Sequence, residues 1–393
     1  MLCVQTFFKK SSLIVFERIV LMRTIYVVTC GTSILTNGAS ETDRIFLREN
    51  ANKLEQDYSP EERDRLENIA ASRRETLLGE SDEARICRCS AELNGFLNYR
   101  RANLTAQHSA GDMAYFVCTD TFQGKLTAGI LADWSRKHEM AADVVKVEDL
   151  NTASVESFHN GVNNLIEWCR TTLPASRERG SRIVFNLIGG FKTLQGYMQT
   201  LGMLYADEIF YIFESGREII TIPRLPLDIS SAAQKAIRAH LAVVRRMNYR
   251  DLPAAECAGL PETMLTVIDG QCTLSAWGRV IFDQVKKELY QERLQPPMID
   301  LFEFSSGAEN DAEKLDPQQR RMLNNAIDDF GAYLETGQNL QRLDFRALKG
   351  NRKPPSTYEF NTWSTQNGWR AFCHYEQDRR KWIIDHFAVG LGH

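Results

Sequence analysis

The sequence predicts an α/β protein whose N-terminal half is a doubly wound parallel sheet. Short apolar or β-branched runs recur at 24–29, 114–118, 143–147, 182–187 and 208–213. Helical patterns separate these runs, including an amphipathic pattern at 155–170 and a long charged stretch over 40–105. Strands that alternate with helices favour a parallel sheet, because each crossover returns along the face of the sheet as a helix.

Length and charge limit the classes of function. The 393 residues exceed what one compact core usually holds, so we expect two or three domains. A net charge of −4 disfavours a protein that coats nucleic acid by charge alone. The segment 341–393 nevertheless carries nine Lys and Arg against five Asp and Glu. This local excess indicates a polyanionic substrate, with a solvated surface as the alternative.

The nine cysteines and the apolar runs point to a cytoplasmic protein. The cysteines form no CxxC pair, and we interpret them as reduced thiols rather than metal ligands. No run of eighteen apolar residues exists, so we expect no membrane association. Residues 1–21 are a weak match to a signal peptide, because Glu17 and Arg18 interrupt the apolar stretch. We expect a loosely held leader or an upstream extension of the reading frame.

The pattern changes after Pro223 and divides the rest of the chain in two. Helical patterns at 230–248, 253–265 and 274–289 predict a small helical middle domain over 226–297, compatible with a winged helix-turn-helix. A Gln-Pro-Pro linker ends it. A strand at 298–304, a helix at 318–335 and three β-rich runs at 358–363, 369–375 and 381–387 follow. They predict an α+β domain with an antiparallel meander over 298–393, after a first domain at 22–225.

Two strand-to-helix turns of the predicted sheet carry small polar residues. Ligands of open parallel sheets bind beyond the carboxyl ends of the strands. Glycines let the backbone approach a phosphate there, and helix N-termini offer unpaired N–H groups. The fingerprints GxGxxG and GxxxxGK[ST] are absent, which disfavours NAD and ATP enzymes. A single Gly-Gly turn can simply connect a strand to a helix, but two such turns in one sheet favour a phosphate-bearing ligand. The candidate residues are Gly31, Thr32, Ser33, Gly189, Gly190, Lys192 and Thr193.

The C-terminal domain contains a cluster of cations and histidines. Cations hold a phosphodiester and stabilise added negative charge, while a histidine or lysine moves protons. RNA supplies its own 2′-hydroxyl nucleophile, so such a site needs no metal. A surface that is merely rich in Lys and Arg is the alternative, and composition alone favours it. The candidates are Lys349, Arg352, Lys353, Arg370, His374 and the final residue, His393.

The motifs IYVVTCGTSI and VFNLIGGFKTLQGYMQTLGMLYADEIFYIFES resemble the CRISPR-associated Rossmann-fold (CARF) sensors of type III CRISPR systems. The resemblance covers roughly residues 23–223. It implies a Rossmann-like fold that binds a cyclic oligoadenylate at the interface of a homodimer, and we expect cyclic tetra-adenylate. The matching positions are the seven turn residues named above, and Thr119 and Thr121 after the second strand are further candidates.

The motifs LKGNRK, TYEFNTWSTQNGWRAFCHYE and RRKWIIDHF resemble the RelE superfamily of mRNA interferase toxins, especially its HigB-like branch. The resemblance covers about residues 298–393 and implies metal-free, cofactor-free cutting of mRNA in the ribosomal A site. It implies that Lys349, Arg352 and Lys353 hold the RNA backbone and that Arg370 stabilises the transition state. His393 is the expected acid/base, with His374 as its alternative. Glu359 and Asn361 depart from the lysine-rich central strand of RelE.

Together the resemblances indicate a CRISPR-associated mRNA interferase, in which a CARF sensor controls a ribosome-dependent nuclease through the middle domain. Three alternatives stay open. A transcription regulator uses the middle domain and Arg238, Arg245 and Arg246 to contact DNA. A HEPN ribonuclease needs an Arg-x(4–6)-His helix, a spacing present at 101–108 and at 380–386. A ring nuclease degrades its own ligand with Lys192 and either Thr32 or Ser33.

Overall fold

The computed structural model describes residues 23–103, 111–212, 218–227, 229–348, 354–363 and 368–390. The chain divides into two compact units, Met1–Leu227 (unit 1) and Asp228–His393 (unit 2). The finer division of unit 2 at residue 297 stays a prediction. Within the described ranges, no helix is long and apolar enough to cross a membrane.

Unit 1 is built on a mixed sheet with the strand order β3-β2-β1-β4-β5-β6. The five strands that the sequence predicts pair in parallel, and the sixth, which was not predicted, returns antiparallel to β5. The parallel sheet is therefore confirmed, and it is compatible with a Rossmann-like domain. The strands are β1 (Thr24–Thr29), β2 (Met113–Cys118), β3 (Ala141–Lys146), β4 (Arg182–Asn186), β5 (Glu208–Ile212) and β6 (Ile219–Pro223).

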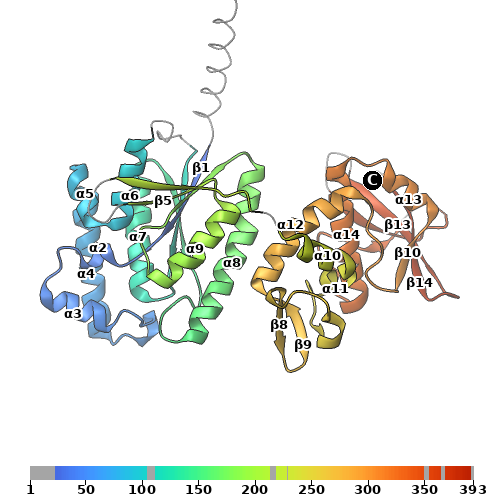
Figure 1. Ribbon diagram of the computed structural model, residues 1–393, viewed down its shortest axis with the longest axis horizontal. Helices are drawn as coiled ribbons and strands as arrows, with labels where there is room; N and C mark the ends of the chain where they lie inside the picture. The colour runs from blue at the N-terminus through green and yellow to red at the C-terminus, as the bar shows by residue number, and fades with distance from the viewer. Residues whose placement is uncertain are drawn as a thin grey trace, which may run out of the picture. The chain divides into compact units, whose positions relative to one another are not determined.

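Helices cover both faces of this sheet. α8 (Val155–Glu178) and α9 (Lys192–Tyr205) lie on one face, and α7 (Phe122–Lys137) lies on the other (Figure 1). The charged stretch between β1 and β2 is helical, as predicted. It forms α2 (Ser33–Thr36), α3 (Glu41–Glu49), a 3₁₀ turn (Glu55–Asp57), α4 (Pro60–Gly79), α5 (Glu83–Cys89) and α6 (Ala91–Ala102).

The central strand β1 places apolar side chains on both faces of the sheet. All six of its residues are buried. Tyr26 and Val28 pack into a core that includes Phe96 of α6 and Phe116 of β2. The Tyr26 and Phe96 rings meet edge to face at 5.0 Å, the geometry that ring quadrupoles favour. This packing holds α6 close to β1 and to the turn that follows β1.

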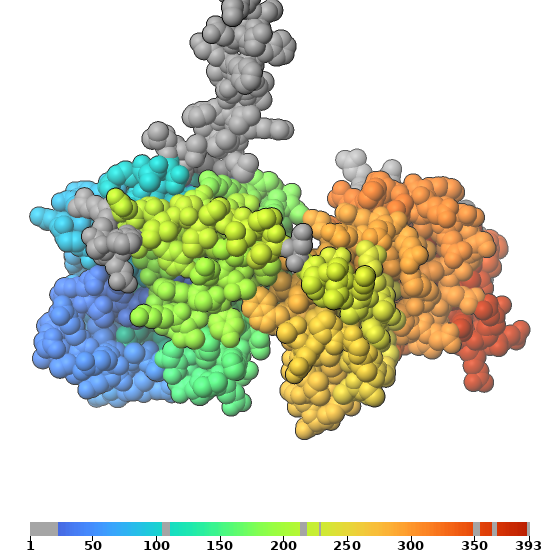
Figure 2. All heavy atoms as spheres, viewed as in Figure 1, coloured from blue at the N-terminus to red at the C-terminus, as the bar shows by residue number. Residues whose placement is uncertain are grey.

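Unit 2 begins with a small helical module that carries a three-stranded sheet. Its helices are α10 (Ser231–Ala239), α11 (Leu241–Arg246) and α12 (Ala276–Glu292). Its strands, in the order β7-β9-β8, are β7 (Leu252–Pro253), β8 (Leu265–Ile268) and β9 (Gln271–Leu274). The β8–β9 hairpin extends from the rest of unit 2 (Figure 1 and Figure 2).

Two predicted helices of this module differ in the structure. The helix expected at 230–248 is two helices that meet at His240. The helix expected at 253–265 contains only the 3₁₀ turns Ala254–Cys257 and Glu262–Met264. Pro253 and Pro261 precede these turns, and Gly259 between them has φ +97°, so a continuous helix cannot form.

The rest of unit 2 is a five-stranded sheet with the order β10-β14-β13-β12-β11. The long strands β12, β13 and β14 form an antiparallel meander, and β10 pairs parallel to β14. The helix α14 begins at Pro317 after the N-cap Asp316, as the sequence indicates. The elements are β10 (Phe302–Phe304), α13 (Ser306–Glu313), α14 (Pro317–Thr336), β11 (Arg346–Ala347), β12 (Tyr358–Trp363), β13 (Trp369–Glu376) and β14 (Lys381–Val389).

A buried ion network joins the helical module to α14 within unit 2. Arg245 of α11 is 1% exposed, and its Nε donates to Asp328 Oδ1 of α14 at 2.6 Å. Tyr290 donates to Asp328 Oδ2 at 2.5 Å, and Lys286 Nζ lies 3.0 Å from the same oxygen. Burial by itself raises the pKa of Asp328, but the Lys286 and Arg245 charges outweigh it and hold that pKa below its usual range.

We predict that Asp328→Ala lowers the free energy of unfolding of unit 2 by about 3–5 kcal/mol, because it leaves Arg245 buried without a counter-charge. The exposed pair between Arg238 and Glu292, 2.7 Å apart, supplies the matched control. Glu292→Ala should cost less than about 1 kcal/mol. Urea unfolding followed by intrinsic fluorescence, with the two units fitted separately, measures both. Equal losses in the two variants would contradict the network's role.

The same network predicts an acid-sensitive unit 2. A carboxyl group whose folded pKa is lowered stabilises the fold above its unfolded pKa, near 3.9 for Asp. That stability is lost as the pH falls through the lower folded value. We therefore expect the unfolding free energy of unit 2 to decrease below about pH 4, and less steeply in Asp328→Asn. Urea titrations at several pH values check this, and parallel slopes in the two proteins would argue against it.

Candidate functional site

The turn residues predicted to bind a ligand gather at one edge of the unit 1 sheet. Gly31, Thr32 and Ser33 follow β1, and Gly189 and Gly190 follow β4. β1 pairs with both β2 and β4, all in parallel, so the carboxyl ends of these three strands are neighbours. A β carbon on Gly31 would lie 3.0 Å from the Gly190 nitrogen, which shows that the two turns are in contact. This edge includes the position where the strand order reverses, the usual ligand position of open α/β sheets.

A buried carboxylate that the sequence analysis missed ties these turns together. Glu92 of α6 is 1% exposed. Its Oε1 accepts a hydrogen bond from the Gly31 amide at 2.7 Å, and its Oε2 accepts from the Ser33 and Ser90 hydroxyls at 3.0 and 2.6 Å. The Gly31 amide and the Ser33 hydroxyl are therefore engaged inside the protein. Only the tertiary structure brings Glu92, 61 residues away, to this turn.

The glycines of the second turn have packing reasons of their own. A β carbon on Gly189 would lie 2.2 Å from Glu92 Oε1 and 2.3 Å from the Thr29 carbonyl oxygen. Thr29 in turn donates from its hydroxyl to the Gly189 carbonyl at 2.7 Å. Gly190 has φ +89°, a conformation that favours glycine. Close contact between the turns thus requires Gly-Gly, independently of any ligand.

The side chains that stay accessible at this edge lie at the start of α9. Lys192 and Thr193 are exposed, and Thr32 is half-buried. Phe191, the N-cap residue of α9, makes no side-chain capping bond, so the first N–H groups of the helix are not capped by it. A cation, a hydroxyl and a helix N-terminus together form an environment that suits an anion.

The two threonines after β2 have a structural role in the helix that follows. Thr121 is the N-cap of α7, and its hydroxyl accepts from the Gly124 amide at 3.2 Å. The Thr119 and Thr121 hydroxyls are 2.8 Å apart. Thr121 is buried and Thr119 is half-buried. Of this pair, Thr119 is the better placed for a ligand, and a binding role stays a prediction for both.

In unit 2, Arg370 lies on the face of the sheet opposite the core. Its neighbours Ala371 and Cys373 point into the apolar core with Phe360, and the alternation of a strand turns Arg370 and His374 to the other face. Arg370 Nη1 donates to Glu359 Oε1 at 3.1 Å.

Glu359 binds a second arginine as well. Arg346 Nε lies 3.1 Å from Glu359 Oε1, and Arg346 Nη1 lies 3.1 Å from Asp344 Oδ2. The described cluster therefore holds two arginines and two carboxylates, with no net charge. Glu359, a departure from the RelE pattern, orients Arg370 by this pairing.

His374 is held by a second carboxylate on the same sheet. His374 Nδ1 lies 3.0 Å from Asp385 Oδ2 of β14, and the Ser356 hydroxyl donates to the same oxygen at 2.7 Å. Asp385 is 4% exposed. An acidic residue within the apolar run KWIIDHF was the available sequence signal for this partner. Sequence reasoning missed it, along with Ser356, Arg346 and Asp344.

Four predicted residues, Lys349, Arg352, Lys353 and His393, lie outside the described residues. In the sequence they follow β11, which carries Arg346, or, for His393, β14, and the first three precede β12, which carries Glu359. In the described ranges, no group of His, Cys, Asp and Glu side chains is arranged to hold a metal ion.

The three arginines of the DNA-binding alternative are engaged in ion pairs. Arg245 is buried against Asp328 and cannot contact DNA. Arg246 lies 3.0 Å from Glu335, and Arg238 pairs with Glu292. These contacts disfavour the transcription-regulator alternative. The HEPN alternative needs its histidine on a helix, but His386 lies on β14, and the other candidate, His108, is outside the described residues.

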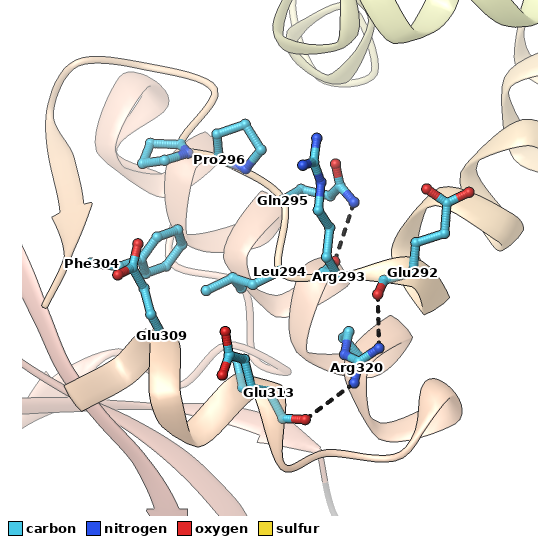
Figure 3. A pocket seen from close by; sticks show the side chains of 11 residues that line it. Glu292, Arg293, Leu294, Gln295, Pro296, Phe304, Glu309, Glu313 and Arg320 are labelled. Carbon is cyan, nitrogen blue, oxygen red and sulfur yellow. Dashed lines mark hydrogen bonds between the residues drawn. The ribbon is translucent and has the colours of Figure 1, made fainter. Parts of the chain in front are cut away.

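A groove of about 690 Å³ lies elsewhere in unit 2 (Figure 3). Two arginines, Arg293 and Arg320, line it, and Arg320 donates to the carbonyls of Gln291 and Leu315 at 2.9 and 2.8 Å. The three carboxylates of Glu292, Glu309 and Glu313 outnumber them. This charge disfavours a phosphate ligand, and neither Arg370 nor His374 lines the groove.

Comparison with known protein families identifies part of unit 1. Residues 87–225 match a family described as "CRISPR-associated protein (Cas_APE2256)". The match begins in α5 and ends just after β6, so it includes Glu92, Thr119, Thr121 and the Gly-Gly turn. It supports a CRISPR-associated protein. No curated protein matches the chain significantly.

We predict that Gly189→Ala destabilises unit 1 by about 1–3 kcal/mol, because the new methyl group overlaps Glu92 and the Thr29 carbonyl. Gly196→Ala, in the helix that follows the same turn, is the matched control. A β carbon added at Gly196 would have no neighbour within 4 Å. That variant should be neutral or more stable by up to about 1 kcal/mol. Urea unfolding measures both, and a neutral Gly189→Ala would contradict the close packing of the turns.

Proposed function

We propose that the protein is a cyclic oligoadenylate-activated effector of a type III CRISPR system that cuts mRNA at the ribosomal A site. The proposed activator is cyclic tetra-adenylate, bound by a cytoplasmic homodimer. The match to a CRISPR-associated family supports the setting of this proposal. The ligand and the reaction rest on the resemblances to CARF sensors and RelE-type toxins, together with the geometry of the two candidate sites.

The sensor part of the proposal is supported by the edge of the unit 1 sheet. The turns after β1 and β4 touch one another, and Lys192 and Thr193 are exposed beside them. Phosphates of a cyclic oligoadenylate carry negative charge and accept hydrogen bonds, which Lys192 and the uncapped start of α9 can supply. In a homodimer both copies present the same turns, as a ring with its own symmetry requires.

The observation that carries the nuclease part is the shared face of Arg370 and His374. Each side chain is half-buried, lies opposite the apolar core and is oriented by a carboxylate. They are four residues apart on β13, about 13 Å along the strand. Arg370 therefore has to exchange Glu359 for the RNA phosphate and extend toward His374 if both act on one phosphate.

The proposed reaction is attack of the RNA 2′-hydroxyl on the adjacent phosphorus. The O2′–P bond forms and the P–O5′ bond breaks, leaving a 2′,3′-cyclic phosphate and a 5′-hydroxyl. A histidine takes the 2′-hydroxyl proton, and the departing 5′ oxygen gains a proton from the imidazolium or from water. Arg370 stabilises the charge on the phosphate oxygens. Lys349, Arg352 and Lys353 hold the backbone, and His393 is the second candidate for proton transfer.

A translation extract programmed with one mRNA tests the proposal. We expect cuts on ribosome-engaged mRNA at codon spacing, only when cyclic tetra-adenylate is present. Arg370→Ala should reduce the cutting rate by about 10²–10³-fold, the usual effect of losing one transition-state donor. Arg379→Ala, which removes an exposed arginine paired with Glu303, is the matched control. Equal cutting of naked RNA would overturn the ribosome dependence, and absence of cutting would overturn the nuclease assignment.

Binding of the activator tests the sensor separately. Lys192→Ala should weaken binding of cyclic tetra-adenylate by about tenfold, as loss of one charge-assisted contact predicts. Lys137→Ala is the control. Lys137 is exposed at the C-terminal end of α7, whereas the candidate ligand edge lies at the N-terminal end of that helix, beside Thr121. Calorimetric titration measures both. Equal affinities in the two variants would place the ligand elsewhere. Linear oligoadenylates formed when the protein is incubated with cyclic tetra-adenylate would show a ring-nuclease activity in addition. The Ser33 hydroxyl, which donates to Glu92, is a candidate group for that reaction.

A further inference from the structure

We infer that Asp385 is a positioning residue that makes His374 the proton acceptor of the nuclease, with Ser356 as a support for Asp385. The inference rests on the proposed function, since it assigns roles within the same reaction. It also chooses between the two histidines that the sequence leaves open.

Asp385 lies at an irregularity in the sheet. The register between β13 and β14 shifts between Phe372 and Cys373, where Phe372 pairs with His386 and Cys373 pairs with Ile384. Asp385 is the extra residue on β14 at this β-bulge. Ile383 pairs with His374, so residue 385, two positions further along β14, lies on the same face as His374 by the alternation of a strand. The Asp385 carboxylate reaches the imidazole there.

The carboxylate decides which ring nitrogen of His374 carries the proton. An ionised carboxylate only accepts hydrogen bonds, so the 3.0 Å contact requires a hydrogen on Nδ1. The neutral imidazole then presents Nε2 with its lone pair, which is the form a base needs. Among the described residues, no hydrogen bond occupies Nε2.

The same contacts exclude a serine nucleophile. In a Ser-His-Asp triad the histidine stands between the serine and the acid. Here the Ser356 hydroxyl donates to Asp385 at 2.7 Å, so the acid stands in the middle. Ser356 is 1% exposed and serves to satisfy the carboxylate. This arrangement agrees with a reaction whose nucleophile, the 2′-hydroxyl, belongs to the substrate.

The neighbouring histidine lacks such a partner. His386 Nδ1 is 3.6 Å from Asp311 Oδ2, beyond hydrogen-bond distance, and its side chain is 46% exposed. His374 is 23% exposed and is held on a rigid strand. By strand pairing and alternation, Arg370, Glu359, Glu376 and Lys381 share its face, and among the described residues none of these four binds the imidazole. Asp385 is thus the charged group that contacts the imidazole directly.

Asp385→Asn tests the inference, because the amide can donate to Nδ1 and favours the opposite tautomer. In the full-length protein, activated by cyclic tetra-adenylate on ribosome-engaged mRNA, we expect kcat to fall by about 10²–10⁴-fold with KM unchanged. Asp385→Glu, which keeps a carboxylate, should recover part of the rate. Nitrogen-15 NMR of histidine-labelled protein should show the Nδ1–H tautomer of His374 in the wild type and the Nε2–H tautomer in Asp385→Asn, with His374→Gln providing the assignment.

Ser356→Ala is the matched control, because it removes a hydrogen bond from the same carboxylate oxygen and leaves the imidazole contact. We expect a rate within about fivefold of the wild type, the size of one neutral hydrogen bond. If the wild type cuts mRNA and Asp385→Asn cuts it equally fast, the inference is wrong but the nuclease assignment is retained. An Nε2–H tautomer in the wild type would also overturn it. A wild type that does not cut would overturn the proposed function and this inference together.

Discussion

The Glu92 carboxylate is the interaction on which the candidate ligand edge of unit 1 depends. It accepts three hydrogen bonds, from the Gly31 amide and the Ser33 and Ser90 hydroxyls. A buried carboxylate is costly unless its oxygens are satisfied, so the turn after β1 must keep these donors in place. The turn after β4 then packs so closely that only glycine fits at position 189. The accessible groups, Lys192 and Thr193, are presented by this rigid base.

The C-terminal sheet follows a comparable rule, in which carboxylates orient the groups proposed to do chemistry. One face is apolar and packs on α14 through Phe330 and Phe360, whose rings stack at 4.5 Å. The other face carries Arg370 with Glu359 and His374 with Asp385. Charge-assisted hydrogen bonds fix these side chains before any substrate arrives. Such preorganisation is what a site needs if the ribosome and its mRNA supply the remaining contacts.

Unit 2 is held together by a third set of buried charges, and these have a different role. Arg245, Asp328 and Tyr290 connect α11, α12 and α14, so the helical module and the C-terminal sheet share one polar junction. Arg245, one of the three arginines that a DNA-binding interpretation uses, is buried there. The helical module thus contacts α14 directly through charged side chains.

The sequence by itself determined the parallel sheet, the helical stretch after β1, the position of the two glycine-containing turns and the capped start of α14. These features follow from local periodicity, turn chemistry and the shared carboxyl edge of parallel strands. Only the tertiary structure decided that Glu92 engages Gly31, that prolines break the helix expected at 253–265, and that Arg245 is buried. It also decided that the Asp385 carboxylate contacts His374 on the neighbouring strand. Partners separated by 61 or 83 residues are chosen by packing, which no local pattern encodes.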